Sequence, residues 1–277
     1  MTPPAAPFGV RLAAAVAEHG PLCVGIDPHP ALLAQWGLTD DGEGVARFAD
    51  VCVAAFAGQV AVVKPQSAFF ERQGFTGIAV LERLLDAFTG TGTLTILDVK
   101  RGDVGSTMDG YADAYLAIGA PLAADAVTLS PYLGFGSLAP ALDAARDAGR
   151  GVFVLARTSN PEGAEVQLAT VGERSVAQGI VDSAAARNEG AEPLGDAGVV
   201  VGATHDHGLD LGALNGPVLA PGIGAQGASP ADIAARFCGL RGLVLPAAAR
   251  SVLAKGPDAA ALRAAATALR DELAAVD

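Results

Sequence analysis

The stretch LTILDVKRGD, residues 94–103, sets a run of aliphatic residues directly against a cluster of charges. The run has the length and the Leu and Ile content of a buried strand. Asp98, Lys100, Arg101 and Asp103 follow at the point where such a strand should end. Because a buried charge without a partner is strongly destabilising, charges in this place need partners or a function. The stretch therefore predicts a strand with a polar site at its carboxyl end.

Seven further short apolar segments resemble this one and are also bounded by turn residues. The eight predicted strands are residues 21–27, 60–66, 94–100, 126–131, 151–158, 197–204, 217–223 and 242–248. They are rich in Val, Ile and Leu and apolar on both faces, which is typical of a parallel sheet covered by helices.

Helical patterns lie before, between and after these segments, at residues 7–20, 44–58, 75–90, 229–239 and 257–277. In one of them Ser229 is placed as an N-cap, with Pro230 at the first helical position and Asp232 at the third. Strands that alternate with helices over about 250 residues predict an α/β fold, a (β/α)₈ TIM barrel. We expect a single domain over residues 1–277, with a helix before the first strand.

A doubly wound open sheet is the alternative, but eight repeats and a closing helix favour the barrel. Two connections depart from the regular pattern. The segment after residue 158 is long, and we expect an extra helix around residues 173–187. The connection between residues 204 and 217 is short, so the sixth helix should be reduced or missing.

Composition excludes several classes of protein. Hydrophobic residues make up 51% of the chain and charged residues 17%, so disorder is not expected. The net charge of −12 argues against binding to nucleic acid or to an anionic membrane surface. No segment has the pattern of a signal peptide or a membrane span.

Cys23, Cys52 and Cys238 show no paired spacing, and we expect reduced core residues in a cytoplasmic protein. His205 and His207 form an H-x-H pair, which is expected to lie in a solvated loop and to bind no metal.

Side chains alternate along a strand, so Asp98 and Lys100 should point the same way, into the mouth of the barrel. Lys64 lies near the end of the preceding strand and is expected at the same level. A salt bridge that merely closes the barrel would also explain Asp98 and Lys100. Nearby carboxylates keep a lysine cationic, and a cationic lysine can donate a proton or stabilise developing negative charge. The charged form disfavours a Schiff base.

Asp103 lies beyond the strand, in the turn toward the next helix, and Thr107 follows four residues later. Both can face outward together.

Residues 219–230 contain a G-x-G-x-x-G pattern at Gly222, Gly224 and Gly227. No acidic residue ends the next strand, so a dinucleotide site is rejected. In a barrel this loop is instead suited to a phosphate. Gln226 and Arg250 are then candidate phosphate ligands. The alternative is a glycine turn beside a surface arginine, without a bound phosphate.

These motifs together resemble the orotidine 5′-phosphate decarboxylase family. The resemblance rests on Asp98-x-Lys100-x-x-Asp103, on Lys64 and Asp27 after the two preceding strands, and on the P-G-x-G-A-Q-G and A-R-S segments, and it spans nearly the whole chain. Residues 130–134 and 158–163 are similar to the longer bacterial group of this family.

The resemblance implies decarboxylation of orotidine 5′-phosphate to uridine 5′-phosphate in pyrimidine biosynthesis, without a cofactor or metal. It implies that Lys100 protonates C6 of the pyrimidine and that Asp98 lies beside the departing carboxylate. It further implies three groups of contacts: Lys64 and Asp27 with the ribose, Gln226 and Arg250 with the phosphate, and Ser159 with the base. Asp103 and Thr107 would reach across the interface of a homodimer to the partner's substrate.

Two other functions stay open at this point. Mg²⁺-dependent keto-sugar-phosphate decarboxylases and hexulose-phosphate synthases resemble the chain in the D-x-K-x-x-D motif. They carry an acidic residue where this chain has Lys64, because the metal needs carboxylate ligands. A barrel that binds phosphate without catalysis is the other alternative, and it would not need Lys100 and Asp98 together.

Overall fold

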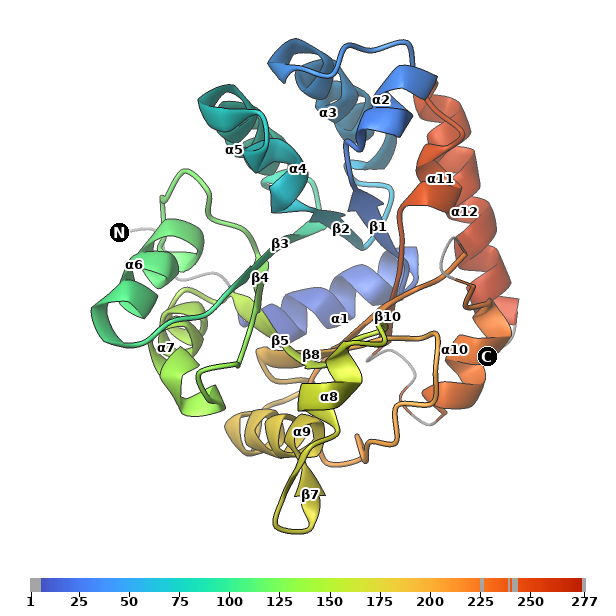
Figure 1. The fold of residues 1–277 in the computed structure, drawn as a ribbon. Helices are drawn as coiled ribbons and strands as arrows, with labels where there is room; N and C mark the ends of the chain where they lie inside the picture. The colour runs from blue at the N-terminus through green and yellow to red at the C-terminus, as the bar shows by residue number, and fades with distance from the viewer. Residues whose placement is uncertain (1–5, 225–226, 239, 241–243, 276–277) are drawn as a thin grey trace.

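Eight parallel strands close into a barrel in a computed structural model that describes residues 6–224, 227–238, 240 and 244–275. Neighbouring strands follow the order β1-β10-β9-β8-β5-β4-β3-β2 (Figure 1). The barrel strands are β1 (Cys23–Ile26), β2 (Val62–Pro65), β3 (Leu94–Arg101), β4 (Ala126–Leu129), β5 (Gly151–Arg157), β8 (Ala197–Val201), β9 (Val218–Pro221) and β10 (Val244–Ala248). Seven predicted segments contain one of them and the eighth ends one residue short of β3, so the predicted (β/α)₈ barrel is confirmed.

Helices surround the strands (Figure 1). They are α1 (Phe8–His19), α2 (Pro30–Gln35), α3 (Gly42–Phe56), α4 (Ser67–Glu71), α5 (Gly74–Phe88), α6 (Gly105–Leu116), α7 (Ala139–Asp147), α8 (Gly163–Gln167), α9 (Val176–Arg187), α10 (Pro230–Arg236), α11 (Arg250–Leu253) and α12 (Ala259–Ala275), with a 3₁₀ turn η1 (Phe135–Leu138). Ser229 caps α10 as predicted. Its hydroxyl accepts the N–H of Asp232 at 3.2 Å, and the Asp232 carboxylate accepts the N–H of Ser229 at 2.9 Å.

The two irregular connections were predicted with mixed success. The helix expected around residues 173–187 is present as α9, but it packs against β5 and β8. It is therefore the regular fifth helix of the barrel, and describing it as extra was wrong. The additional material is α8 together with the hairpin of β6 (Thr170–Val171) and β7 (Arg174–Ser175). Between β8 and β9 every residue is described and none is helical, which confirms that the sixth helix is missing.

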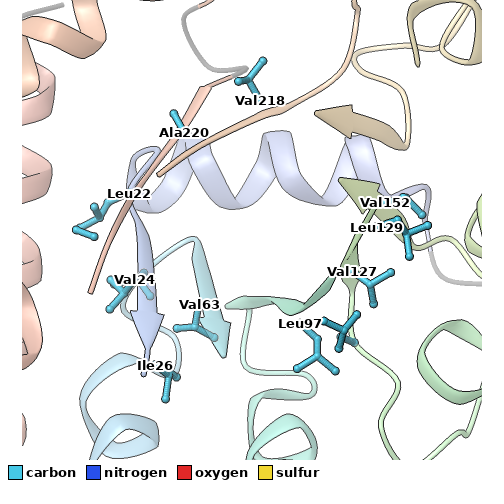
Figure 2. Close-up of a cluster of buried hydrophobic side chains, with 14 of the residues drawn as sticks. Leu22, Val24, Ile26, Val63, Leu97, Val127, Leu129, Val152, Val218 and Ala220 are labelled. Carbon is cyan, nitrogen blue, oxygen red and sulfur yellow. The ribbon is translucent and has the colours of Figure 1, made fainter. Parts of the chain in front are cut away.

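Alternate side chains of each strand point to opposite sides of the barrel wall. One set faces the surrounding helices in a buried cluster that includes Val24, Val63 and Val127 (Figure 2). The other set points into the barrel, where Phe153 meets Phe8 of α1 with ring centroids 6.1 Å apart. In Figure 1, α1 crosses behind the strands.

Helix α1 covers the amino-terminal end of the barrel. Its Arg11 is ion-paired with Asp125, the residue directly before β4. The Asp125 carboxylate also accepts the N–H and the hydroxyl of Thr95 at 2.9 and 3.1 Å. The carboxylate is thus satisfied within the fold, and the open end of the barrel is the carboxyl end of its strands.

The three cysteines are unpaired, and two of them are core residues as expected. Cys23 and Cys52 are buried, whereas Cys238 is exposed, so the core assignment of Cys238 was wrong. The reason is local: α10 ends at Arg236, and Phe237 takes the buried position beyond it.

The H-x-H pair divides between two environments. His205 is exposed, whereas the ring of His207 stacks on Phe237 with centroids 5.2 Å apart. No group of three or more His, Cys, Asp or Glu residues able to hold a metal occurs in the described part of the chain. None of the described helices has both the length and the apolar character to cross a membrane.

Candidate functional site

A cavity of about 780 Å³ opens at the carboxyl end of the barrel. Each barrel strand, or the residue or loop directly after it, contributes to its lining. Six of the predicted site residues line it: Asp27, Lys64, Asp98, Lys100, Ser159 and Arg250. The chain has three lysines, and the two that carry this prediction both line the cavity.

Asp98 is the centre of a hydrogen-bonded charge array. Its Oδ2 accepts Nζ of Lys64 at 2.9 Å and Nε2 of Gln66 at 3.0 Å. Its Oδ1 accepts Nζ of Lys100 at 2.5 Å and the hydroxyl of Thr128 at 2.8 Å. Asp98 and Lys64 are almost fully buried, whereas 44% of the Lys100 side chain is exposed. Lys100 is therefore the cation of the array that a bound molecule can reach.

Lys64 reaches Asp98 from a position nearer the amino end of the barrel than expected. Val62 pairs with Leu94 and Gln66 with Asp98, so Gln66 is the residue at the level of Asp98. Lys64 lies two residues nearer the amino end of β2, and its four-carbon side chain spans the difference. The prediction that the two residues share a level was wrong, although the predicted contact is present.

Lys100 reaches Asp98 through an irregularity in β3 rather than through simple alternation. The pairing of β3 with β4 shifts between Leu97 and Arg101. Lys100 has a φ of 46°, a left-handed conformation that costs a residue with a Cβ roughly 1–2 kcal/mol. A bulge of this kind re-aims side chains and is frequent beside active sites. The convergence of the two residues was predicted, but its structural cause was not.

The array is ionic, because neighbouring opposite charges stabilise the charged forms of Lys64 and Asp98. Burial would lower the pKa of the Lys64 ammonium, but the carboxylates of Asp98 and Asp27 outweigh burial and hold this pKa above its usual value. Burial would raise the pKa of Asp98, but Lys64 and Lys100 outweigh it and hold the pKa well below its usual range. At neutral pH Asp98 is therefore a carboxylate and Lys64 a cation.

Asp27 has a carboxylate oxygen that can accept a further hydrogen bond. Its Oδ1 is buried and accepts no hydrogen bond from any described residue. Burial raises the pKa of this carboxyl, and the nearby Lys64 acts in the opposite direction. A buried oxygen without a partner next to a cavity is suited to accept a hydrogen bond from a ligand hydroxyl.

The glycine-rich loop and Arg250 lie together at another part of the cavity rim. Gly222 lines the cavity beside Arg250. Gly224, with a φ of 72°, is so close to Ser251 that a Cβ there would lie 3.1 Å from the serine side chain. The loop therefore packs against the start of α11, and the guanidinium of Arg250 in that helix is suited to an anion. Gln226 lies outside the described residues.

Asp103 and Thr107 stand apart from this cavity. Neither lines it. Asp103 is half-buried in the turn before α6 and accepts the N–H of Val104 at 2.8 Å, and Thr107 is exposed on the first turn of α6. Thr107 therefore faces outward as expected, whereas Asp103 is only partly exposed.

Residues not predicted as site residues also belong to the site. Gln66 and Thr128 both bond to Asp98. Each occurs at an inward position of a predicted strand, so alternation combined with polarity could have found them. Beyond β5, Gln167 of α8 bonds the backbone N–H and the hydroxyl of Thr158 at 3.0 and 2.7 Å. Sequence spacing gave no signal for that contact.

The fold and the cavity define a (β/α)₈ barrel whose open end holds two lysines paired with one buried carboxylate. The model of the Orotidine 5′-phosphate decarboxylase / HUMPS family matches residues 20–265. The chain belongs to this family.

Several relatives share most of the chain. It is 62% identical over 261 residues to the orotidine 5′-phosphate decarboxylase of Salinispora arenicola, with 94% of each chain covered. Identity to the protein of the same name from Streptomyces coelicolor is 57% over 263 residues, again with 94% of each covered. A crystal structure of a provisionally assigned orotidine 5′-phosphate decarboxylase from Streptomyces avermitilis matches with a TM-score of 0.96 and 53% identity, covering 99% of this chain and 96% of that one.

Proposed function

We propose that the chain decarboxylates orotidine 5′-phosphate to uridine 5′-phosphate, as a carboxy-lyase of pyrimidine biosynthesis. The observation that carries this function is the contact of Lys100 with Asp98 at the exposed end of a buried ionic array. The relatives named for this activity are 56–62% identical over nearly the whole chain. A spectrophotometric assay with orotidine 5′-phosphate tests the proposal directly.

The reaction breaks the bond between C6 of the pyrimidine and its carboxylate. Carbon dioxide leaves, and the electron pair stays on C6 in the plane of the ring, where the π system cannot accept it. Nζ of Lys100 gives C6 its proton, and Lys100 later regains a proton from water. A cation fixed beside C6 before the reaction also stabilises the developing charge, so no cofactor or metal takes part in the proposed reaction. Asp98 keeps Lys100 in place and lies beside the departing carboxylate.

The rest of the substrate is held by the polar groups around the cavity. Lys64 and Asp27 bind the ribose hydroxyls, for which the unpartnered Oδ1 of Asp27 is suited. Ser159 contacts the base. Gln226 and Arg250 bind the phosphate, and the energy of this remote contact helps to orient the base against Lys100.

We expect Arg250→Ala to weaken binding of the phosphate rather than the chemical step. A hydrogen bond to a charged group is worth about 1.5–3 kcal/mol, so KM should rise roughly 10- to 150-fold. Steady-state kinetics with orotidine 5′-phosphate and with the free nucleoside measure this effect. Arg47, which is exposed on α3 and pairs with Glu43, gives the matched control Arg47→Ala. An unchanged preference for the phosphorylated substrate in Arg250→Ala would remove Arg250 from the site.

A homodimer with shared active sites accounts for Asp103 and Thr107. They do not line the cavity of their own barrel, which supports a role in a neighbouring one. Val104, Tyr132 and Leu133 expose apolar side chains on the loops after β3 and β4, and exposed apolar patches often mark interfaces. In a two-fold dimer Asp103 and Thr107 of each subunit complete the partner's site.

We also infer a cytoplasmic location, because three unpaired cysteines are typical of a reducing compartment.

A further inference from the structure

Thr128 is the single β4 residue opposite a three-residue bulge that carries the reactive pair. Leu97 pairs with Val127 and Arg101 with Leu129. Three residues of β3 lie between those pairs, but only Thr128 lies between them on β4. The regular backbone ladder is therefore interrupted where Asp98 and Lys100 stand, and other contacts must fix the backbone there.

The hydroxyl of Thr128 provides those contacts. It accepts the backbone N–H of Lys100 at 3.0 Å and donates to Oδ1 of Asp98 at 2.8 Å. Nζ of Lys100 reaches the same Oδ1 at 2.5 Å. A closed ring of hydrogen bonds thus runs from the Lys100 backbone through Thr128 and Asp98 to the Lys100 ammonium.

The Thr128 hydroxyl thus forms a bridge between the Lys100 backbone and the Asp98 carboxylate. This bridge is important because Thr128 is buried and because the backbone of Lys100 has an unfavourable conformation. Only 1% of Thr128 is exposed, so water cannot readily replace its hydroxyl. Lys100 has a left-handed φ of 46°, a conformation that a residue with a Cβ adopts only when its surroundings enforce it. The N–H of Lys100 is bonded to the Thr128 hydroxyl, so this contact holds the backbone in that conformation.

The geometry points to Thr128 as a positioning residue for decarboxylation, which fixes the Lys100 ammonium and the Asp98 carboxylate relative to each other. This inference rests on the proposed function. Thr128 acts through Lys100 and Asp98 and transfers no proton itself. A reactive group displaced by about 1 Å can lose on the order of 100-fold in rate, so the bridge is expected to affect kcat.

Thr128→Val keeps the size of the side chain and removes its hydroxyl. We expect kcat to fall about 10- to 100-fold while KM stays within a few-fold of the wild type. Thr128→Ser restores the hydroxyl and should recover most of kcat. Thr128→Ala serves in place of Thr128→Val if the valine variant does not fold, because it removes the same hydroxyl without adding bulk.

Thr95 offers a matched control at the opposite end of the barrel. It is also buried, and its hydroxyl accepts the N–H of Asp125 at 3.0 Å and donates to that carboxylate at 3.1 Å. Thr95→Val should lower the midpoint of thermal unfolding but leave kcat near the wild-type value, with all variants assayed well below their midpoints.

Three outcomes can be told apart. A wild-type protein that does not decarboxylate orotidine 5′-phosphate rejects the proposed function itself. An active wild type with unchanged kcat in Thr128→Val, or with Thr128→Ser as impaired as Thr128→Val, overturns the positioning role. A selective loss of kcat in Thr128→Val, rescued by serine and absent from Thr95→Val, supports it.

Discussion

Lys100→Ala is expected to lower kcat by at least about 10⁴-fold while the protein stays folded. General acid catalysis contributes roughly 10²–10⁴-fold, and a preorganised charge at the reacting atom adds a further loss when removed. The fold should survive because much of the Lys100 side chain is exposed and Asp98 keeps its bonds to Lys64, Gln66 and Thr128. Steady-state kinetics give kcat, and circular dichroism during heating gives the unfolding midpoint.

Lys255→Ala is the control for Lys100→Ala. Lys255 is the third lysine of the chain and is exposed beyond α11. Its removal changes the net charge equally and should leave kcat unaltered. A kcat of Lys100→Ala within tenfold of the wild type would exclude Lys100 as the proton donor.

Asp103→Ala should inactivate the enzyme almost as severely, and its activity should return when the protein is mixed with Lys100→Ala. If Asp103 completes the neighbouring site, a mixed dimer has one site without either residue and one intact site. Random exchange makes half of the dimers mixed, so about a quarter of wild-type activity should appear under this symmetry. Each variant alone should stay inactive.

Subunit exchange must be demonstrated in the same mixture, for example with two tags of different mass. Asp109→Ala provides a nearby control, because Asp109 is an exposed acidic residue of α6, the helix that follows Asp103. It should be active alone and should show no gain on mixing with Lys100→Ala beyond its own contribution. Full exchange without recovered activity would mean that Asp103 serves its own subunit.

The barrel could be predicted because its signals are local. Eight aliphatic runs bounded by turn residues mark the strands, and Ser229 and Asp232 mark a helix start through a short-range cap. The role of α9 was misjudged because the long segment after β5 holds both a regular helix and the insertion of α8 with its hairpin. Only packing against β5 and β8 shows which part belongs to the barrel.

Six of the residues that line the cavity could be predicted from the sequence, but their geometry could not. Alternation predicted that Asp98 and Lys100 meet on one side of β3. The pairing is present, but it arises through the bulge in β3. The bulge, the left-handed φ of Lys100 and the contact of the Thr128 hydroxyl with the Lys100 N–H depend on the register between β3 and β4. Register is set by the whole closed barrel, so no single segment encodes it.

The most direct test of the central claim is the absorbance change of orotidine 5′-phosphate on addition of purified protein with excess EDTA. The proposed reaction needs only side chains of the protein, so the absorbance should fall at the same rate with and without the chelator, and uridine 5′-phosphate should form in equal amount. No loss of absorbance, or a rate that returns only when Mg²⁺ is added, would contradict decarboxylation by the lysine and carboxylate array and would favour the metal-dependent phosphosugar chemistry instead.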